Sequence, residues 1–249
     1  MLLTLHHLPM TTACTLLWLT AAWLSSSQTK PGPSAPAAFE PTALPAKAAR
    51  TAAFVPTGWL LERQVSGDLN GDKRADPVLV LIERPSTTAP EARRERAVVV
   101  LLADAAGQLQ RVAASGRVLY GSGGPDPLIS ADKMPEIKVE NGMLVVRHLS
   151  GTEQNLEFTH RFAYDTGSKK MRLASEEQIK SNRQTLDTTI RSSDYLAGKQ
   201  RTERVYRDPA DPDGRRQLTS RKDATLPKAP KRYLEDVDVR KITADSGIK

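Results

Sequence analysis

Eight short apolar runs follow one another through the middle of this chain, and they constrain its fold more than any other feature. Each run has the length of a β-strand, and residues typical of turns separate it from the next. The runs are Trp59–Leu61, Val78–Ile82, Val98–Leu102, Leu109–Val112, Val118–Tyr120, Ile137–Val139, Leu144–Val146 and Leu156–Tyr164. This spacing predicts a mainly β domain in which neighbouring strands pair as antiparallel hairpins.

The pattern within the runs indicates how deeply each strand is buried. Val78–Ile82 and Val98–Leu102 are apolar throughout, which predicts central strands buried on both faces. Polar and apolar residues alternate within Leu156–Tyr164, as in a half-exposed strand. Asn141-Gly142 supplies the residue types that a tight hairpin turn with positive φ angles requires.

The N-terminus carries the features of a secretory signal. Thr15–Leu24 is apolar and uncharged, and the small residues Ser25–Ser27 follow it. A transmembrane helix needs about 20 apolar residues, and this run has about half that length. We therefore predict a signal peptide over residues 1–27, with Met1 and Met10 as alternative starts. The mature chain is expected to be periplasmic or extracellular, without a membrane span.

Composition divides the rest of the chain into three parts. Residues 28–53 are rich in Pro and Ala, which predicts an unstructured linker. The β-rich domain is expected over residues 54–207. Beyond Glu176 the chain becomes rich in Ser and Thr, which indicates one more hairpin, and residues 208–249 are predicted to form a loose, basic, Pro-containing tail.

Cysteine content and charge limit the chemistry and the partners. The only cysteine is Cys14, so the mature chain is expected to lack disulfides and a thiol nucleophile. Residues 199–249 hold 14 Lys and Arg against 9 Asp and Glu, which gives +5 of the total charge of +7. A basic excess favours anionic partners. However, Tyr206 and Tyr233 are the only aromatic residues of this segment, which argues against a nucleic-acid partner.

One motif has the spacing of a metal-binding loop. Asp68, Asn70, Asp72 and Asp76 place oxygen-bearing side chains at positions one, three, five and nine of a loop, and the carbonyl of Arg74 occupies position seven. Calcium takes six to eight oxygen ligands from loops of this type. The motif therefore predicts a calcium (Ca2+) site.

The loop and its surroundings resemble a known family. The aspartate loop leads directly into an apolar strand, with Phe54–Trp59 ahead of it, the Gly-rich segment Gly121–Pro127 beyond it and Phe162–Tyr164 near the end. In these features, the stretch from Phe54 to Glu176 resembles FG-GAP and VCBS-type repeat proteins, and in particular small exported bacterial proteins with a single loop. The resemblance implies a β-rich, calcium-associated exterior module, and it implies no activity.

Two positions depart from the full calcium-loop pattern. Leu79 stands at position twelve, where a complete EF-hand loop has Glu. Lys73 stands at position six, where Gly is expected because the turn requires positive φ, at a cost of roughly 1 to 2 kcal/mol for other residues. The alternative is a metal-free turn in which the aspartates cap backbone N–H groups.

No catalytic constellation stands out. His148 and His160 lie within strand-like runs, which favours a structural role over that of a general base. Gly121–Gly124 lacks the spacing of a nucleophile elbow or a phosphate-binding loop. Glu176 and Glu177 are adjacent, so on a strand they point to opposite faces.

We therefore expect a non-enzymatic, exported binding module whose partner is a protein, a glycan or an envelope polymer. The alternative is a secreted hydrolase with a dispersed site, for instance with Asp126 and Asp132 beside a metal ion.

Overall fold

The computed structural model describes residues 38–90, 92–122, 134–151, 154–211, 213 and 216–241. Residues 1–37, which include the expected signal peptide and the first part of the expected linker, lie outside the described residues, and so do residues 242–249. Residues Ala35–Lys249 form one compact unit. Its described part consists of antiparallel strands and three short 3-10 helices, so the mainly β, antiparallel fold class is confirmed.

The first sheet is built from the N-terminal strands. Its order is β1 (Lys47–Ala48), β5 (Leu109–Ser115), β4 (Arg96–Ala103), β3 (Asp76–Glu83) and β2 (Trp59–Gly67), and each neighbour pairs antiparallel.

The two central strands of this sheet, β3 and β4, are buried on both faces, as predicted. Val78 and Val80 point into one apolar core, while Leu79 and Leu81 point into a second core on the opposite face. A continuous apolar run is needed here because successive side chains of a strand alternate between faces.

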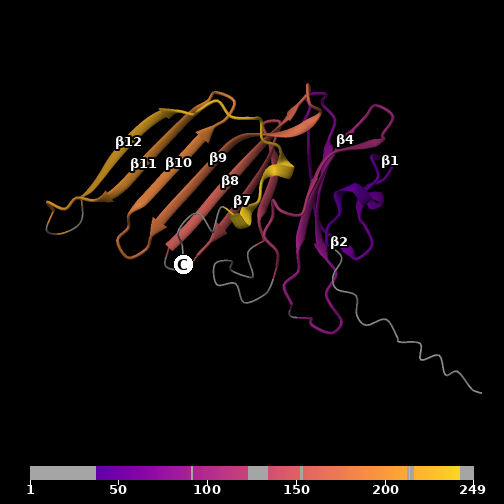
Figure 1. Cartoon of the computed structure of the whole chain (residues 1–249), viewed down its shortest axis with the longest axis horizontal. Coiled ribbons are helices and arrows are strands. Elements are labelled where there is room, and N and C mark those ends of the chain that lie inside the picture. The colour runs from indigo at the N-terminus through magenta and orange to yellow at the C-terminus, as the bar shows by residue number, and fades with distance from the viewer. Residues whose placement is uncertain are drawn as a thin grey trace, which may run out of the picture. The chain divides into compact units, whose positions relative to one another are not determined.

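The second sheet is a meander of the remaining strands, seen side by side in Figure 1. Its strands follow chain order, and each connects to the next by a hairpin or a longer loop. They are β6 (Glu136–Glu140), β7 (Met143–Ser150), β8 (Gln154–Asp165), β9 (Lys170–Asn182), β10 (Thr188–Asp194), β11 (Lys199–Arg207) and β12 (Gln217–Thr225). The expected turn Asn141-Gly142 joins β6 to β7 with φ angles of 51° and 72°.

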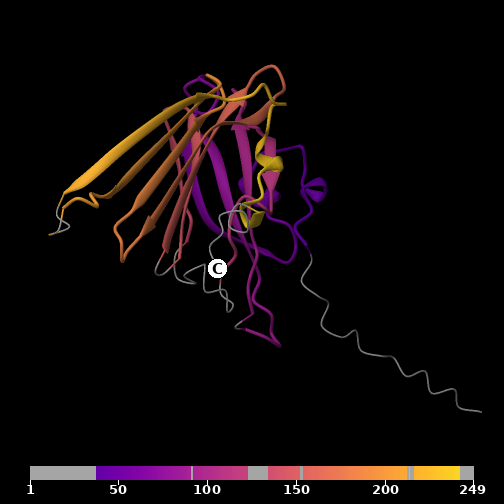
Figure 2. The ribbon, with the colours of Figure 1, turned by 60° about the vertical axis from the view of Figure 1, so that its left-hand side comes forward.

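Only part of the second sheet packs on the first. Apolar side chains of β6 to β9, such as Ile137, Leu144 and Phe162, share one core with Val78 and Val100 of the first sheet. Strands β10 to β12, which we call the wing, continue the sheet beyond this core, and Figure 2 shows them extending to its outer edge. No described residue of β11 or β12 is buried, so backbone pairing holds these strands.

The segment before the domain is more ordered than the sequence indicates. From residue 38 onward it forms 3-10 helix η1 (Pro41–Ala43), strand β1 and 3-10 helix η2 (Thr51–Phe54). Leu44 and Phe54 are buried against the second core, and this burial orders a Pro- and Ala-rich segment that composition alone predicts to be a linker.

The chain beyond β11 also differs from expectation over the residues described. Residues expected to belong to a loose tail form β12 and 3-10 helix η3 (Leu234–Asp236). Leu234 and Val237 are buried in the core between the sheets, and the N–H of Val239 donates to the carbonyl of Arg117 at 3.0 Å. A few spaced apolar residues are enough to fix this segment once a core is present.

One strand predicted from an apolar run is not formed. Val118–Tyr120 is buried, but it follows β5 as an irregular segment. The preceding residue, Arg117, accepts a backbone hydrogen bond from Val239 near the C-terminus.

Among the residues described, no helix has the length and apolar character needed to cross a membrane.

Candidate functional site

The aspartate loop between β2 and β3 is held by its own backbone. The carboxylate of Asp68 accepts hydrogen bonds from the N–H groups of Asn70 (3.2 Å), Gly71 (2.7 Å), Asp72 (3.2 Å) and Lys73 (2.8 Å). Lys73 has a φ of 65°, so the left-handed conformation required at position six is adopted by a residue with a Cβ.

The middle of the loop is closed by an ion pair. The carboxylate of Asp72 accepts from the backbone N–H of Arg74 (2.9 Å), from its guanidinium (2.5 Å) and from the side-chain amide of Asn70 (3.0 Å). The backbone hydrogen bond from Arg74 is the largest cause that lowers the pKa of Asp72, which therefore stays ionised at neutral pH.

Asp76 closes the loop from inside the protein. Its side chain is fully buried, and it accepts from the N–H groups of Leu69 and Ala103, each at 2.9 Å. Burial raises the pKa of this carboxyl although both hydrogen bonds act in the opposite direction.

These contacts decide how well the loop fits a cation. The carboxylate oxygens of Asp68, Asp72 and Asp76 are directed at N–H groups, and among the described residues no group of three or more acidic, His or Cys side chains converges on a common point. In this conformation the predicted calcium ligands Asp68, Asn70, Asp72, Arg74 and Asp76 lie in one loop, and the carboxylates of Asp68, Asp72 and Asp76 accept hydrogen bonds from N–H groups. The geometry fits the alternative of aspartates that cap backbone N–H groups.

The two histidines of the domain lie in strands, as expected, and both are buried. His148 (β7) and His160 (β8) alternate with aromatic rings: His148 stacks on Phe158 with 4.8 Å between ring centroids, and His160 stacks on Phe162 at 6.1 Å. Burial lowers the pKa of His148 to about 3, so its ring is neutral at physiological pH. The stacked histidine and phenylalanine rings thus pack together in the interior of the protein.

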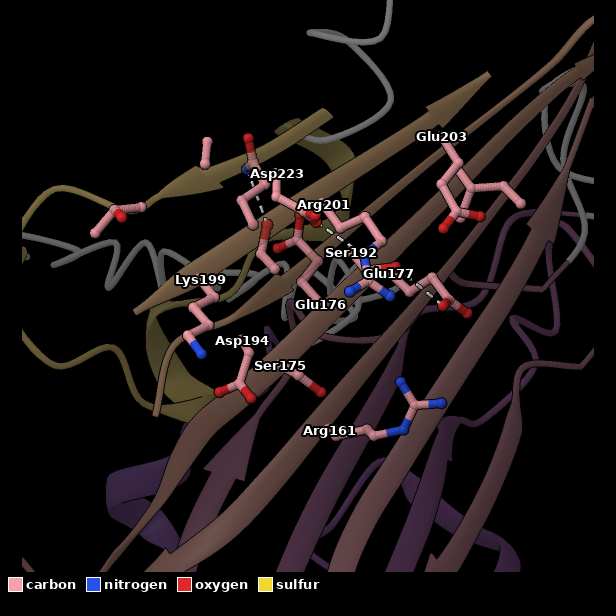
Figure 3. A pocket seen from close by; sticks show the side chains of 15 residues that line it. Arg161, Ser175, Glu176, Glu177, Ser192, Asp194, Lys199, Arg201, Glu203 and Asp223 are labelled. Atoms are coloured by element: carbon pink, nitrogen blue, oxygen red, sulfur yellow. Dashed lines mark hydrogen bonds and ion pairs between the residues drawn. The ribbon is translucent and has the colours of Figure 1, made fainter. Parts of the chain in front are cut away.

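A groove formed by described residues lies on the outer face of the second sheet. It has a volume of about 940 Å3 and crosses β8 to β12 (Figure 3). Its lining is polar and mostly charged. The residues are Arg161, Ser175, Glu176, Glu177, Ile190, Ser192, Ser193, Asp194, Lys199, Gln200, Arg201, Glu203, Asp223, Ala224 and Thr225.

One row of side chains crosses the groove from strand to strand. Figure 3 shows Glu177, Ser192, Arg201 and Asp223 in line, one from each of β9 to β12. The hydroxyl of Ser192 donates to Glu177 at 3.3 Å, and the guanidinium of Arg201 donates to Asp223 at 2.9 Å. The bond from Arg201 is the main cause that lowers the pKa of Asp223.

Other charges of the groove have no such partner. Within the described part of the chain, Arg161, Lys199 and Glu203 make no hydrogen bond or ion pair through their side chains. Asp194 instead accepts from the N–H groups of Leu196 (2.9 Å) and Ala197 (2.8 Å) and so fixes the β10–β11 turn.

Glu176 and Glu177 serve different faces, as their adjacency indicates. Glu177 contacts Ser192 in the outer groove, whereas Glu176 contacts the buried His160, with 3.6 Å between carboxylate oxygen and ring nitrogen. Burial alone would raise the pKa of Glu176, but the contact with His160 and the charge of Arg232 lower it.

Sequence reasoning missed this groove because its strands lack an apolar period. The only signal is alternation of charged and small polar residues in Lys199–Arg207 and Gln217–Thr225. The acids Asp126 and Asp132, suggested for a hydrolase site, lie outside the described residues, as does the Gly-rich segment from residue 123 onward.

Comparison of the chain with protein-family models, with curated proteins and with solved structures finds no match. The resemblance to FG-GAP and VCBS-type repeats therefore rests on the sequence features alone, of which the loop over residues 68–76 is the most specific.

Proposed function

We propose that this protein is a non-enzymatic binding module, and that the groove on β8 to β12 holds an extended polypeptide segment of mixed charge. The observation that carries the proposal is a groove of about 940 Å3 that is lined both by the hydrogen-bonded row and by three charged side chains without a partner among the described residues. Two of the strands that carry this row, β11 and β12, have no buried residue among those described. Charged strands of this kind are available to contact a partner.

The protonation state of the carboxyl groups in the groove favours a binding function over general acid catalysis. A general acid in a hydrolase needs a raised pKa so that it carries a proton near neutral pH. The pKa of Asp223 in the central row is instead lowered, mainly by the hydrogen bond from Arg201. Asp223 therefore remains an anion that accepts a hydrogen bond from Arg201 and pairs with it.

The lining also indicates the class of partner. Arg161, Lys199 and Glu203 offer both signs of charge without an ion pair among the described residues. None of the described lining residues is aromatic, so the groove offers no platform on which sugar rings or bases stack. A polypeptide with acidic and basic side chains matches this surface best.

Two further parts of the proposal come from the sequence. The apolar segment Thr15–Leu24 supports export to the periplasm or the exterior. The loop over residues 68–76 supports membership of the FG-GAP and VCBS-type group, and its hydrogen bonds hold the connection between β2 and β3.

The test uses the chain from Gln28 onward, which contains the whole compact unit. Random 12-residue peptides displayed on phage are selected against it, and the affinity of an enriched peptide is measured by calorimetry. Lys199→Glu should weaken binding by about tenfold or more, because it replaces an unpaired cation of the groove with an anion.

Arg204→Glu is the matched control, because Arg204 is exposed on the opposite face of the same strand β11. It should bind like the parent. Equal losses in both variants, or an enriched peptide indifferent to Lys199→Glu, would count against the groove.

A further inference from the structure

A second pocket lies where the C-terminal segment returns to the sheet, and it differs from the groove in charge. It has a volume of about 460 Å3 and is formed by the start of β9, the β10–β11 turn and residues 225–232. Its four charged lining residues are all cations. They are Arg172, Lys228, Lys231 and Arg232.

Backbone hydrogen bonds fix the walls of this basic pocket. The N–H of Leu173 donates to the carbonyl of Arg232 at 2.9 Å, and the N–H of Leu226 donates to the carbonyl of Gly198 at 2.8 Å. Pro227 and Pro230 restrict the segment between them. The cations are therefore held together by the fold, although residues 172 and 232 are far apart in the sequence.

The positive charge extends beyond the pocket lining. Lys169 in the β8–β9 turn and Lys170 at the start of β9 are exposed. The ammonium group of Lys170 lies 5.2 Å from the ring centroid of Tyr233, and a β-bridge joins Tyr233 to Arg172. Lys231 pairs with Asp165 at 2.8 Å, and this contact is the main cause that lowers the pKa of Asp165 to about 2. Asp165 thus offsets Lys231, and Glu176 interacts with the charge of Arg232, which leaves Arg172 and Lys228.

The remaining cations have capacity for a ligand. Lys228 is exposed and makes no ion pair within the described part of the chain, and the guanidinium of Arg172 makes only a 3.5 Å contact with the carbonyl of Tyr195. Arg and Lys together suit an oxyanion, because guanidinium binds phosphate oxygens in pairs and ammonium adds a point charge.

The pocket also has an apolar border. Leu196, at the tip of the β10–β11 turn, is 52% exposed, and it lines the pocket beside Pro227 and Ala229. An exposed leucine next to a cluster of cations matches a ligand with a charged head and an apolar remainder.

We propose that the basic pocket binds a phosphate-bearing group of the glycerophosphate type. Two sources share this chemistry, namely the headgroup of an anionic phospholipid and a soluble phosphate ester. The pocket adjoins the groove proposed for the polypeptide partner and shares Thr225 with it, but its cations are different residues, and either proposal stands without the other.

The experiment measures both sources with the chain from Gln28 onward. Sedimentation with vesicles that contain phosphatidylglycerol, against vesicles of phosphatidylcholine alone, measures the lipid arm. Titration calorimetry with glycerol 3-phosphate measures the soluble arm. Lys228→Glu is compared with Lys222→Glu, which changes another exposed lysine, on β12 and outside the pocket.

Lys228→Glu should weaken binding to the responding probe by about tenfold, because each cation near an anionic surface contributes substantially to affinity, whereas Lys222→Glu should bind like the parent. A response to vesicles alone assigns the lipid source, and a response to glycerol 3-phosphate assigns the soluble one. No binding to either probe would overturn the proposal, and so would equal losses in the two variants, which indicate a general charge effect. Unchanged melting midpoints confirm that both variants are folded.

Discussion

The carboxylate of Asp76 accepts a hydrogen bond from the backbone N–H of Ala103 at 2.9 Å, across 27 residues of sequence. Its second oxygen accepts from Leu69 in the loop, also at 2.9 Å. One buried side chain therefore ties the aspartate loop to the end of β4. The last aspartate of the motif is a structural anchor of the first sheet.

Replacing Asp76 with Asn should destabilise the protein by about 2 to 3 kcal/mol, because an amide group would face N–H donors and a charge-assisted hydrogen bond would be lost in a buried site. Urea unfolding followed by circular dichroism measures this change. Asp72→Asn is the comparison, because Asp72 belongs to the same loop but is partly exposed. A loss for Asp72→Asn as large as that for Asp76→Asn would contradict the anchoring role.

Calcium should leave the melting midpoint of the parent unchanged relative to chelator, because the loop carboxylates already accept from N–H groups and from Arg74. A thermal melt in each condition is the measurement. If calcium raises the midpoint of the parent but not of Asp72→Ala, the loop rearranges to bind metal and the calcium hypothesis from the sequence is correct.

Breaking a buried ion pair should lower the free energy of unfolding more than breaking an exposed one. Arg96 donates to both carboxylate oxygens of Glu62, at 2.7 and 2.8 Å, and it also donates to the carbonyl of Gly121. Glu62→Gln should cost about 3 kcal/mol because it leaves a buried guanidinium without its counter-charge. Glu140→Gln, which breaks the exposed pair with Lys138, should cost under about 1 kcal/mol by urea unfolding.

His148 should make stability depend on pH. Its pKa falls from 6.5 to about 3 on folding, so below about pH 6.5 the unfolded chain binds a proton that the folded chain does not. Stability from this residue is complete above pH 6.5 and is lost towards pH 3, at up to about 1.4 kcal/mol per pH unit. Denaturation at several pH values should show a shallower slope for His148→Leu. An unchanged slope would mean that the ring is accessible to protons.

Much of the fold was predictable because the relevant residues carry their own pattern. The continuous apolar runs of β3 and β4 indicated strands with a core on each face, and Asn141-Gly142 indicated a tight turn. The strands β11 and β12 were not predictable in this way. Val205, Tyr206 and Leu218 are their only large apolar residues, and backbone pairing with the preceding strand fixes them.

The loop and the groove were also predictable only as far as their residues carry a pattern in the sequence. The motif over residues 68–76 was visible because its oxygen-bearing side chains recur at fixed spacing, but spacing did not reveal that they turn towards N–H groups. The groove was invisible because Glu177 and Asp223 are 46 positions apart and become neighbours of one row only through the register of four strands.

The most direct test of the binding function places a probe inside the groove. Ser192 lies in the central row of the groove, and Ser220 is exposed on the opposite face of the wing. The only cysteine, Cys14, precedes Gln28, so Ser192→Cys or Ser220→Cys introduces a single thiol for an environment-sensitive fluorophore in the chain from Gln28 onward. Titration with a peptide selected against the parent should change the emission at position 192 and leave position 220 unchanged. A change at position 220 alone, or at neither position while the peptide binds, would contradict the groove as the binding site.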